Sequence, residues 1–115
     1  MIPERGGIYL ANLIPSRGTE PGKTRPCVVI QNELLNESGH PSTVILPVTS
    51  NLLDDAAPLR FSLTARDKLG KNSQVLVDQP RTIDNTRLSS GLLATLTGIE
   101  LAQLEEFLKI VLGFE

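Results

Sequence analysis

The apolar residues of this chain come in short runs, each about the length of a β-strand. Eight prolines and nine glycines are spread through the 115 residues and separate these runs. Short apolar or alternating segments bounded by turn residues are typical of β-strands. The expected strands cover residues 7–13, 25–31, 43–48, 59–63 and 73–78, and residues 82–83 extend the pairing beyond Pro80.

The C-terminal segment differs, because its apolar residues have helical spacing. Thr97 and Glu100 fit a capping box, in which both side chains satisfy free backbone donors at a helix start. Gly113 is placed to end the helix. The residues that fall on one helical face are Leu101, Leu104, Leu108, Val111 and Leu112. Short strands followed by one amphipathic helix predict a mainly β protein with α: a small antiparallel barrel with the helix packed on it.

The segments between the expected strands are polar and indicate loops. Residues 14–24, 32–42 and 49–58 fall in this class, and Pro47 inside the third strand predicts a bulge or an edge position. The length, and the absence of repeats and linkers, predict a single domain over residues 1–115.

Composition limits the cellular compartment and the kinds of partner that we expect for this chain. A net charge of −2 argues against a general polyanion-binding domain, although the acidity lies mainly in residues 98–115 and a local basic site elsewhere stays possible. No apolar stretch is long enough for a membrane span, and the N-terminus has no signal-like segment, so we expect a cytoplasmic protein without a membrane partner.

Histidine and cysteine are too scarce for several kinds of catalytic site. His40 and Cys27 are the single residues of their types, which argues against a zinc site and against a Cys–His pair. Cys27 lies in an apolar run and is expected to be a buried, unreactive thiol. We therefore predict neither a metal nor a cofactor.

Polar residues follow or precede several expected strands and form the candidate site. Taken singly, each of them fits a cap, a turn or a surface ion pair. In a small barrel, however, strand ends on one rim converge, so a carboxylate, an arginine and a hydroxyl could meet there. The candidates are Glu20, Arg25, Asn32, Thr49, Ser50, Asp78, Gln79 and Arg81, with the loop cations Arg17 and Lys23.

The chemistry open to Glu20, Arg25 and Thr49 is narrow. A guanidinium matches phosphate oxygens and stays charged. A carboxylate can accept a proton from a nearby hydroxyl, and a threonine hydroxyl can donate to a developing oxyanion. Together they suit phosphodiester cleavage within RNA, where the ribose 2′-OH attacks the adjacent phosphate and neither a metal nor a protein nucleophile is required.

Four motifs in order resemble the MazF/PemK/Kid toxin family. They are Arg5-Gly-Gly-Ile-Tyr9; the run from Leu13-Ile-Pro-Ser-Arg-Gly-Thr-Glu20 to Thr24-Arg-Pro-Cys-Val-Val-Ile-Gln-Asn32; Pro47-Val-Thr-Ser50; and Val77-Asp-Gln-Pro-Arg-Thr-Ile-Asp84. The resemblance covers nearly the whole chain and ends in the single C-terminal helix.

The resemblance implies an SH3-like barrel, a homodimer and a metal-independent endoribonuclease. Such a toxin cuts single-stranded RNA, usually mRNA, at a short sequence and leaves 2′,3′-cyclic phosphate and 5′-hydroxyl ends. It also implies a MazE-like antitoxin partner, whose flexible acidic segment covers the RNA groove and whose complex with the toxin binds DNA.

The family's site residues map onto this sequence by motif. Arg25 matches the catalytic arginine, Thr49 the hydroxyl residue after the third strand, and Glu20 the acidic loop residue proposed as base in some members. Asp78 and Gln79 match positions used for catalysis or base reading. Thr19 and Leu76 stand where the Kid-type branch can carry a histidine and an arginine, which favours the Glu20/Arg25/Thr49 arrangement. RNA and antitoxin are expected on the rim carrying Arg17, Lys23, Arg25, Arg81 and Arg87.

Two rival functions remain open from the sequence. One is a non-catalytic relative that binds a protein, of the gyrase-poison type; the ending Gly113-Phe-Glu115, without the Trp-Gly-Ile of such poisons, counts against it. The other is a plain binding barrel in which Glu20 and Arg25 form a loop clasp. The dimer is also open, because Leu92, Leu93 and Leu96 could be covered by a second copy or by packing within the chain.

Overall fold

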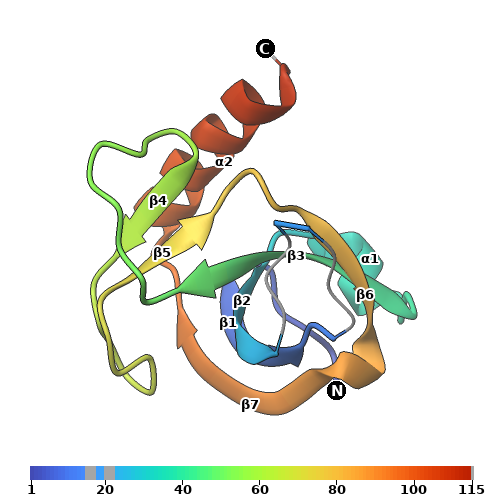
Figure 1. Ribbon diagram of the computed structural model, residues 1–115. Coiled ribbons are helices and arrows are strands. Elements are labelled where there is room, and N and C mark those ends of the chain that lie inside the picture. The colour runs from blue at the N-terminus through green and yellow to red at the C-terminus, as the bar shows by residue number, and fades with distance from the viewer. Residues whose placement is uncertain (15–17, 20–22, 115) are drawn as a thin grey trace.

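The computed structural model describes residues 1–14, 18–19 and 23–114. Within them it has seven strands and two α-helices, and the chain ends in the longer helix (Figure 1). The strands are β1 (Gly7–Asn12), β2 (Thr24–Val29), β3 (Ser42–Thr49), β4 (Arg60–Leu63), β5 (Ser73–Leu76), β6 (Arg81–Asp84) and β7 (Leu88–Thr95). The helices are α1 (Glu33–Glu37) and α2 (Gly98–Leu112), and a 3₁₀ turn covers Asn85–Arg87.

All strand pairs are antiparallel, and the sheet coils into a barrel-like shape without closing. The order along it is β4–β5–β3–β2–β1–β7, and β6 pairs with β3 beside β5. The predicted fold class, a mainly β barrel-like domain with a C-terminal helix, is confirmed.

Strand β3 lies in the middle of the sheet, and one of its edges pairs with two different strands. Its first half pairs with β6, as far as Ile45, and its end pairs with β5, from Val48. Pro47 falls between these two ladders while facing Cys27 of β2 on the other side. Pro47 therefore lies neither in a bulge nor on an edge strand, as was expected, but at the point where β3 changes partner. Proline has no N–H, and between the two ladders none is needed for pairing.

Two elements differ from the sequence expectation. Strand β7 covers residues that were not among the expected strands, and it pairs with β1 along an irregular register. Residues 32–42 include α1, which Asn32 caps and whose Asn36 is buried against Gln31. Both elements depend on contacts with distant segments.

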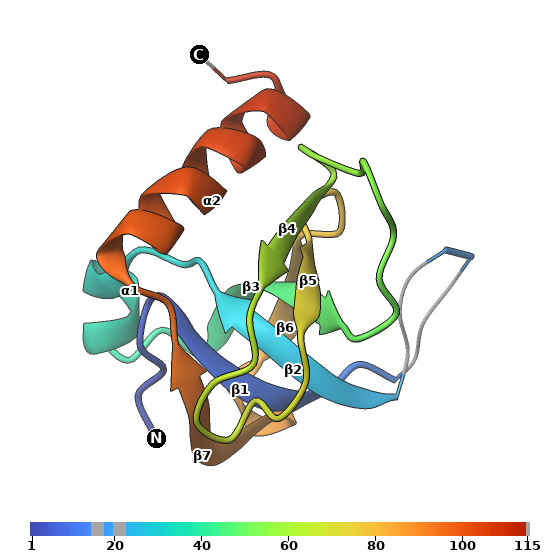
Figure 2. The ribbon, with the colours of Figure 1, turned by 90° about the vertical axis from the view of Figure 1, so that its left-hand side faces the viewer.

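The core has two parts, one on each face of the coiled sheet. One face carries Ile8, Val28 and Leu46 and packs against α2, where Phe107 meets Phe61 edge-on at 5.4 Å between ring centres. The other face carries Tyr9, Cys27 and Ile45 inside the coil. This division follows from the alternation of side chains along each strand. Figure 2 shows α2 on one side of the sheet and the end of β3 at the opposite edge.

The helix α2 begins and ends as the sequence predicts. Thr97 and Glu100 form both hydrogen bonds of the capping box, and Gly113 ends the helix in the left-handed conformation at φ 78°. Leu104 is buried, whereas Leu112, on the predicted apolar face, is 45% exposed. In the part of the chain that the structure describes, no helix is long and apolar enough to cross a bilayer.

Candidate functional site

Arg25 lies at the start of β2, on the inner face of the coiled sheet. It pairs with Ala11 of β1, and it is half-buried. Cys27, two residues further along the same face, is fully buried, so the backbone that carries Arg25 is fixed by core packing. Burial raises the pKa of the Cys27 thiol to about 12, which keeps it neutral and excludes it as a nucleophile.

Thr49 belongs to the same cross-strand row as Arg25. The β2–β3 ladder pairs Cys27 with Pro47, and continued by two residues along each strand it puts Arg25 opposite Thr49. Opposite residues of an antiparallel pair have their side chains on the same face. Thr49 in turn pairs with Gln74 of β5. Arg25 and Thr49 therefore share one face of the sheet, at the start of β2 and the end of β3, and these two strand ends lie on the side away from α2 (Figure 2).

Gln74 is a residue of this row that the sequence analysis missed. Its buried side-chain carbonyl accepts from Leu53 N at 3.0 Å and from Arg60 Nη1 at 3.0 Å, and its amide donates to Leu53 O at 2.9 Å. Arg60 also donates to Asn51 O at 2.7 Å. These contacts fix the segment that follows Thr49. The sequence feature that could have identified it is a glutamine directly before the apolar run Val75-Leu-Val77 of an expected strand.

Arg81 supports the base of the loop that carries Glu20. Its Nη1 donates to Leu13 O at 2.9 Å, while Leu13 N donates to Lys23 O at 2.9 Å. Arg81 pairs with Ile45, so it lies on the same face of the sheet as Arg25 and Thr49. Glu20 and Arg17 lie outside the described residues. Lys23 is exposed at the other end of that loop, with φ 65°.

Asp78 and Gln79 form the turn after β5 and line a pocket of about 320 Å³. The Gln79 N–H donates to Leu76 O at 3.2 Å, which closes the turn. Thr19, Leu59 and Arg60 contribute to the same pocket. Leu53 and Arg60, which bind Gln74, also line it, so the pocket lies between Thr19 and the segment that follows Thr49.

Ser50 and Asn32 have different surroundings. Ser50 is exposed directly beside Thr49, whose Oγ1 accepts from Asn51 N at 3.1 Å. Asn32 lies beyond the opposite end of β2, seven residues and roughly 20 Å of extended chain from Arg25. Its side chain accepts from Leu34 N at 2.8 Å as the cap of α1. The structure thus puts Arg25, Thr49 and Arg81 on one face of the sheet and Asp78 and Gln79 in the turn after β5, and it leaves Asn32 at the opposite end of β2.

Comparison with known proteins identifies the fold. The family model described as PemK-like, MazF-like toxin of type II toxin–antitoxin system matches residues 4–112. The chain belongs to this toxin family. The resemblance inferred from the four sequence motifs is therefore confirmed.

Several solved structures superpose over almost the entire chain. The MazF of Deinococcus radiodurans is 27% identical, with a TM-score of 0.81 and 99% of each chain covered. A MazE–MazF structure from the same organism gives 26% identity, a TM-score of 0.77 and full coverage of both chains. A protein described as an endoribonuclease from a mycobacterial species shares the fold at 19% identity, with a TM-score of 0.77 over 99% of this chain and 94% of its own.

Proposed function

We propose that this toxin is a sequence-specific, metal-independent endoribonuclease that cleaves single-stranded RNA. The observation that carries the proposal is the β2–β3 pairing, whose alternation puts Arg25 and Thr49 on one face at neighbouring strand ends. A guanidinium and a hydroxyl placed together match the oxygens of a phosphodiester. The mycobacterial protein of the same fold is described as an endoribonuclease, which agrees with this reading.

The proposed reaction is an internal transesterification. The ribose 2′-OH loses its proton to a base, for which Glu20 is the candidate, and its oxygen attacks the neighbouring phosphorus. The P–O5′ bond breaks, and the leaving O5′ takes a proton from water, whose hydroxide is neutralised by the proton that the base accepted. Arg25 stabilises the charge on the phosphoryl oxygens and Thr49 donates a hydrogen bond to one of them. The products are a 2′,3′-cyclic phosphate and a 5′-hydroxyl.

Recognition of the RNA bases is assigned to the neighbouring pocket. Asp78 and Gln79 offer hydrogen-bonding side chains there. Arg17, Lys23 and Ser50 provide a charged and polar rim for the backbone, whereas Arg81 acts by holding Leu13 at the base of the loop. Asn32 is not included, because it caps α1.

The test is cleavage of diverse single-stranded RNAs in excess EDTA by the wild type, Arg25→Ala and Lys109→Ala. Lys109 is an exposed residue of α2 paired with Glu106, so its variant is a matched control for loss of a positive charge. We expect selective cuts with cyclic phosphate ends from the wild type and Lys109→Ala. Arg25→Ala should fold and not cleave. Undiminished cutting by folded Arg25→Ala would refute the mechanism.

We also propose an acidic antitoxin and a second copy of the chain as partners. A Deinococcus radiodurans relative is described as a MazE–MazF complex, which supports an antitoxin of this kind. Apolar side chains left exposed on and near α2, among them Ile110 at 64% and Phe114 at 68%, favour a homodimer interface. Sedimentation of the toxin alone and with a co-expressed antitoxin tests both partners.

A further inference from the structure

A second pocket lies at the same strand ends, on the opposite face of the sheet from Arg25. It has a volume of about 410 Å³, within the range of roughly 300–1,000 Å³ that small-molecule sites occupy. Its apolar floor comes from Leu10, Val48, Leu69 and Leu93. Val48 and Pro26, which also lines it, are the chain neighbours of Thr49 and Arg25, so only the thickness of the sheet separates this pocket from the proposed cleavage row.

The charge of this pocket is positive. Lys68 and Lys71 are the charged residues among those that line it, whereas the pockets lined by Glu100, by Glu105 and by Asp78 each contain an acid. Neither lysine takes part in an ion pair with another described residue. Asp67, although next in sequence to Lys68, does not line the pocket. In a chain of net charge −2, this local excess of positive charge favours an anionic ligand.

The loop that carries the two lysines is held in place by backbone contacts. Arg66 N and Leu69 O are bonded at 2.9 Å, with the reciprocal bond from Leu69 N to Arg66 O at 2.8 Å. Lys68 N donates to Leu93 O of β7 at 2.9 Å, and Leu69 is buried. The lysine backbones are therefore positioned before any ligand arrives, which lowers the ordering cost of binding.

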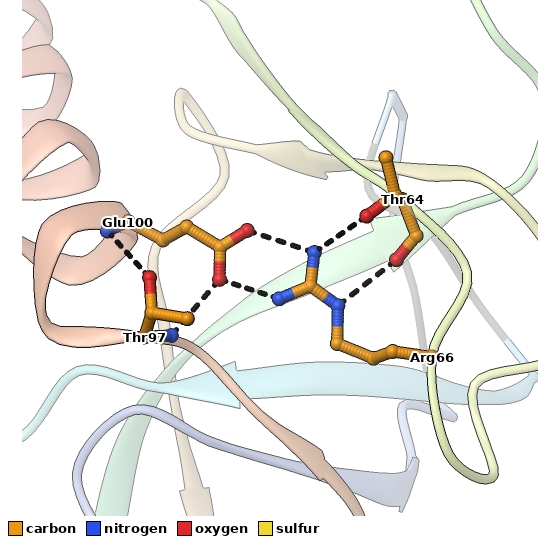
Figure 3. Close-up of polar contacts among 4 residues, drawn as sticks. All are labelled: Thr64, Arg66, Thr97 and Glu100. Atoms are coloured by element: carbon orange, nitrogen blue, oxygen red, sulfur yellow. Dashed lines mark hydrogen bonds and ion pairs between the residues drawn. The ribbon is translucent and has the colours of Figure 1, made fainter.

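Side chains anchor the same loop to α2. The Arg66 guanidinium binds the carboxylate of Glu100 and the hydroxyl and carbonyl of Thr64, while Glu100 also accepts from Thr97 N (Figure 3). A separate bond from Ala65 N to Asn72 Oδ1 at 2.8 Å closes the loop.

We propose that this pocket binds a nucleotide of the RNA that flanks the scissile phosphate. The proposal rests on the proposed function, since it takes the Arg25–Thr49 row as the cleavage point. A nucleotide offers a flat base for the aliphatic floor and a phosphate for Lys68 and Lys71. Ser50 supplies a hydroxyl at the pocket wall, while the Ser73 hydroxyl donates to Lys71 O at 2.9 Å and holds the loop. The RNA strand then passes around the sheet edge, with its scissile phosphate at Thr49.

Continuity with Thr49 favours RNA over an acidic peptide as the occupant. Thr49 and Ser50 line this pocket and also belong to the proposed cleavage region. A substrate bound at the cleavage row must leave it in both strand directions. In this proposal one exit leads toward the Asp78–Gln79 pocket, and the other leads into the pocket with the two lysines, which Thr49 lines.

The experiment measures binding of a short fluorescent single-stranded RNA of randomised sequence, fully 2′-O-methylated so that its 2′-oxygens cannot attack. The wild type is compared with Lys68→Gln/Lys71→Gln and with Lys109→Gln over a range of salt. We expect the double variant to weaken binding by roughly two- to fivefold per lysine. The slope of log affinity against log salt should fall by about 0.7 for each phosphate that the variant no longer neutralises, and Lys109→Gln should match the wild type.

A second readout locates the RNA directly. The same oligonucleotide carrying 4-thiouridine is crosslinked by light to the wild type, and the modified peptides are identified by mass spectrometry. We expect crosslinks in residues 68–73 and at Leu93. The assignment of a nucleotide to this pocket would be wrong if Lys68→Gln/Lys71→Gln bound RNA as well as Lys109→Gln did. It would also be wrong if crosslinks were confined to residues 76–81 and to the segment around Leu53 that Gln74 binds. Neither result would contradict the proposed function.

Other results separate the two proposals further. Loss of antitoxin binding by the double variant with RNA binding unchanged would make the pocket a peptide site and overturn the nucleotide assignment. A folded wild type that neither binds nor cleaves any RNA would refute the proposed function, and the pocket assignment with it.

Discussion

Arg66 and Glu100 form a two-point ion pair that joins the 64–72 loop to the first turn of α2. Arg66 Nη2 lies 2.7 Å from Glu100 Oε2, and Nη1 binds the other carboxylate oxygen. The same carboxylate accepts from Thr97 N at 2.9 Å within the capping box. The hydrogen bonds from Arg66, assisted by the bond from Thr97, lower the pKa of Glu100 from 4.5 to about 2. The Glu100 side chain thus caps the start of α2 and also binds the 64–72 loop.

This pair predicts an acid-dependent loss of stability. A carboxyl whose pKa is lower in the folded state contributes stability that is complete above its unfolded value, near 4.5, and is lost as the pH falls toward 2. Glu100→Gln keeps an oxygen that can accept from Thr97 N but removes the charge. We expect this variant to be less stable at pH 7 by roughly 1–2 kcal/mol. It should also show a flatter fall in stability between pH 5 and pH 2.

Urea unfolding at a series of pH values measures the effect. Glu106→Gln, a change of the same kind at an exposed position of α2, is the control and should follow the wild type. Parallel pH profiles for Glu100→Gln and the wild type would contradict the assigned role of the ion pair.

Thr49 gives a prediction about catalysis. Thr49→Val removes a donor aimed at the proposed phosphoryl oxygen, so we expect kcat for RNA cleavage to fall by about 100-fold with little change in KM. Thr49→Ser retains the hydroxyl and should keep most of the activity. Because Oγ1 also accepts from Asn51 N, the thermal stability of both variants must be checked. Similar kcat values for the valine and serine variants would remove Thr49 from the mechanism.

Two glycines in paired strands should respond in opposite ways to alanine. A Cβ at Gly7 would lie 2.8 Å from Tyr9 Cε2 and 3.0 Å from the backbone oxygen of Glu4, so Gly7→Ala should destabilise the fold by roughly 1–3 kcal/mol. Gly91 has open space at that position. Gly91→Ala should raise the stability by roughly 0.4–1 kcal/mol, because it restricts the unfolded chain. Chemical unfolding compares the two, and a stability change of the same sign and size in both would contradict this account.

Cys27 should be chemically silent in the folded protein. Burial raises its pKa to about 12, so the thiolate fraction at pH 8 is roughly a thousandfold below that of an ordinary exposed thiol. A disulfide reagent such as DTNB should react at once with the urea-unfolded chain. In native buffer, the reaction should be slow and limited by opening of the fold. Rapid native labelling would show that the inner face of β2 is accessible.

Local interactions explain which features could be predicted from the sequence. The α2 boundaries follow from Thr97, Glu100 and Gly113, whose effects act within one helical turn. The strands β1 to β6 follow from apolar runs and their turn residues, and the burial of Cys27 follows from its place in such a run. The positions of Arg25 and Thr49 at strand ends were also visible, because they adjoin these runs.

The tertiary structure decided what those local patterns leave open. Strand β7 pairs with β1 although its residues were not among the expected strands, and Pro47 is tolerated because β3 changes partner there. Asn32 caps a helix far from Arg25. Gln74 pairs with Thr49, and the loop that carries Lys68 and Lys71 lines a pocket together with Thr49. Strand register and loop placement depend on contacts between residues distant in sequence, which residue type and spacing do not specify. The sequence by itself therefore determined the elements and the chemical groups of this protein, and only the folded sheet decided which of those groups stand together.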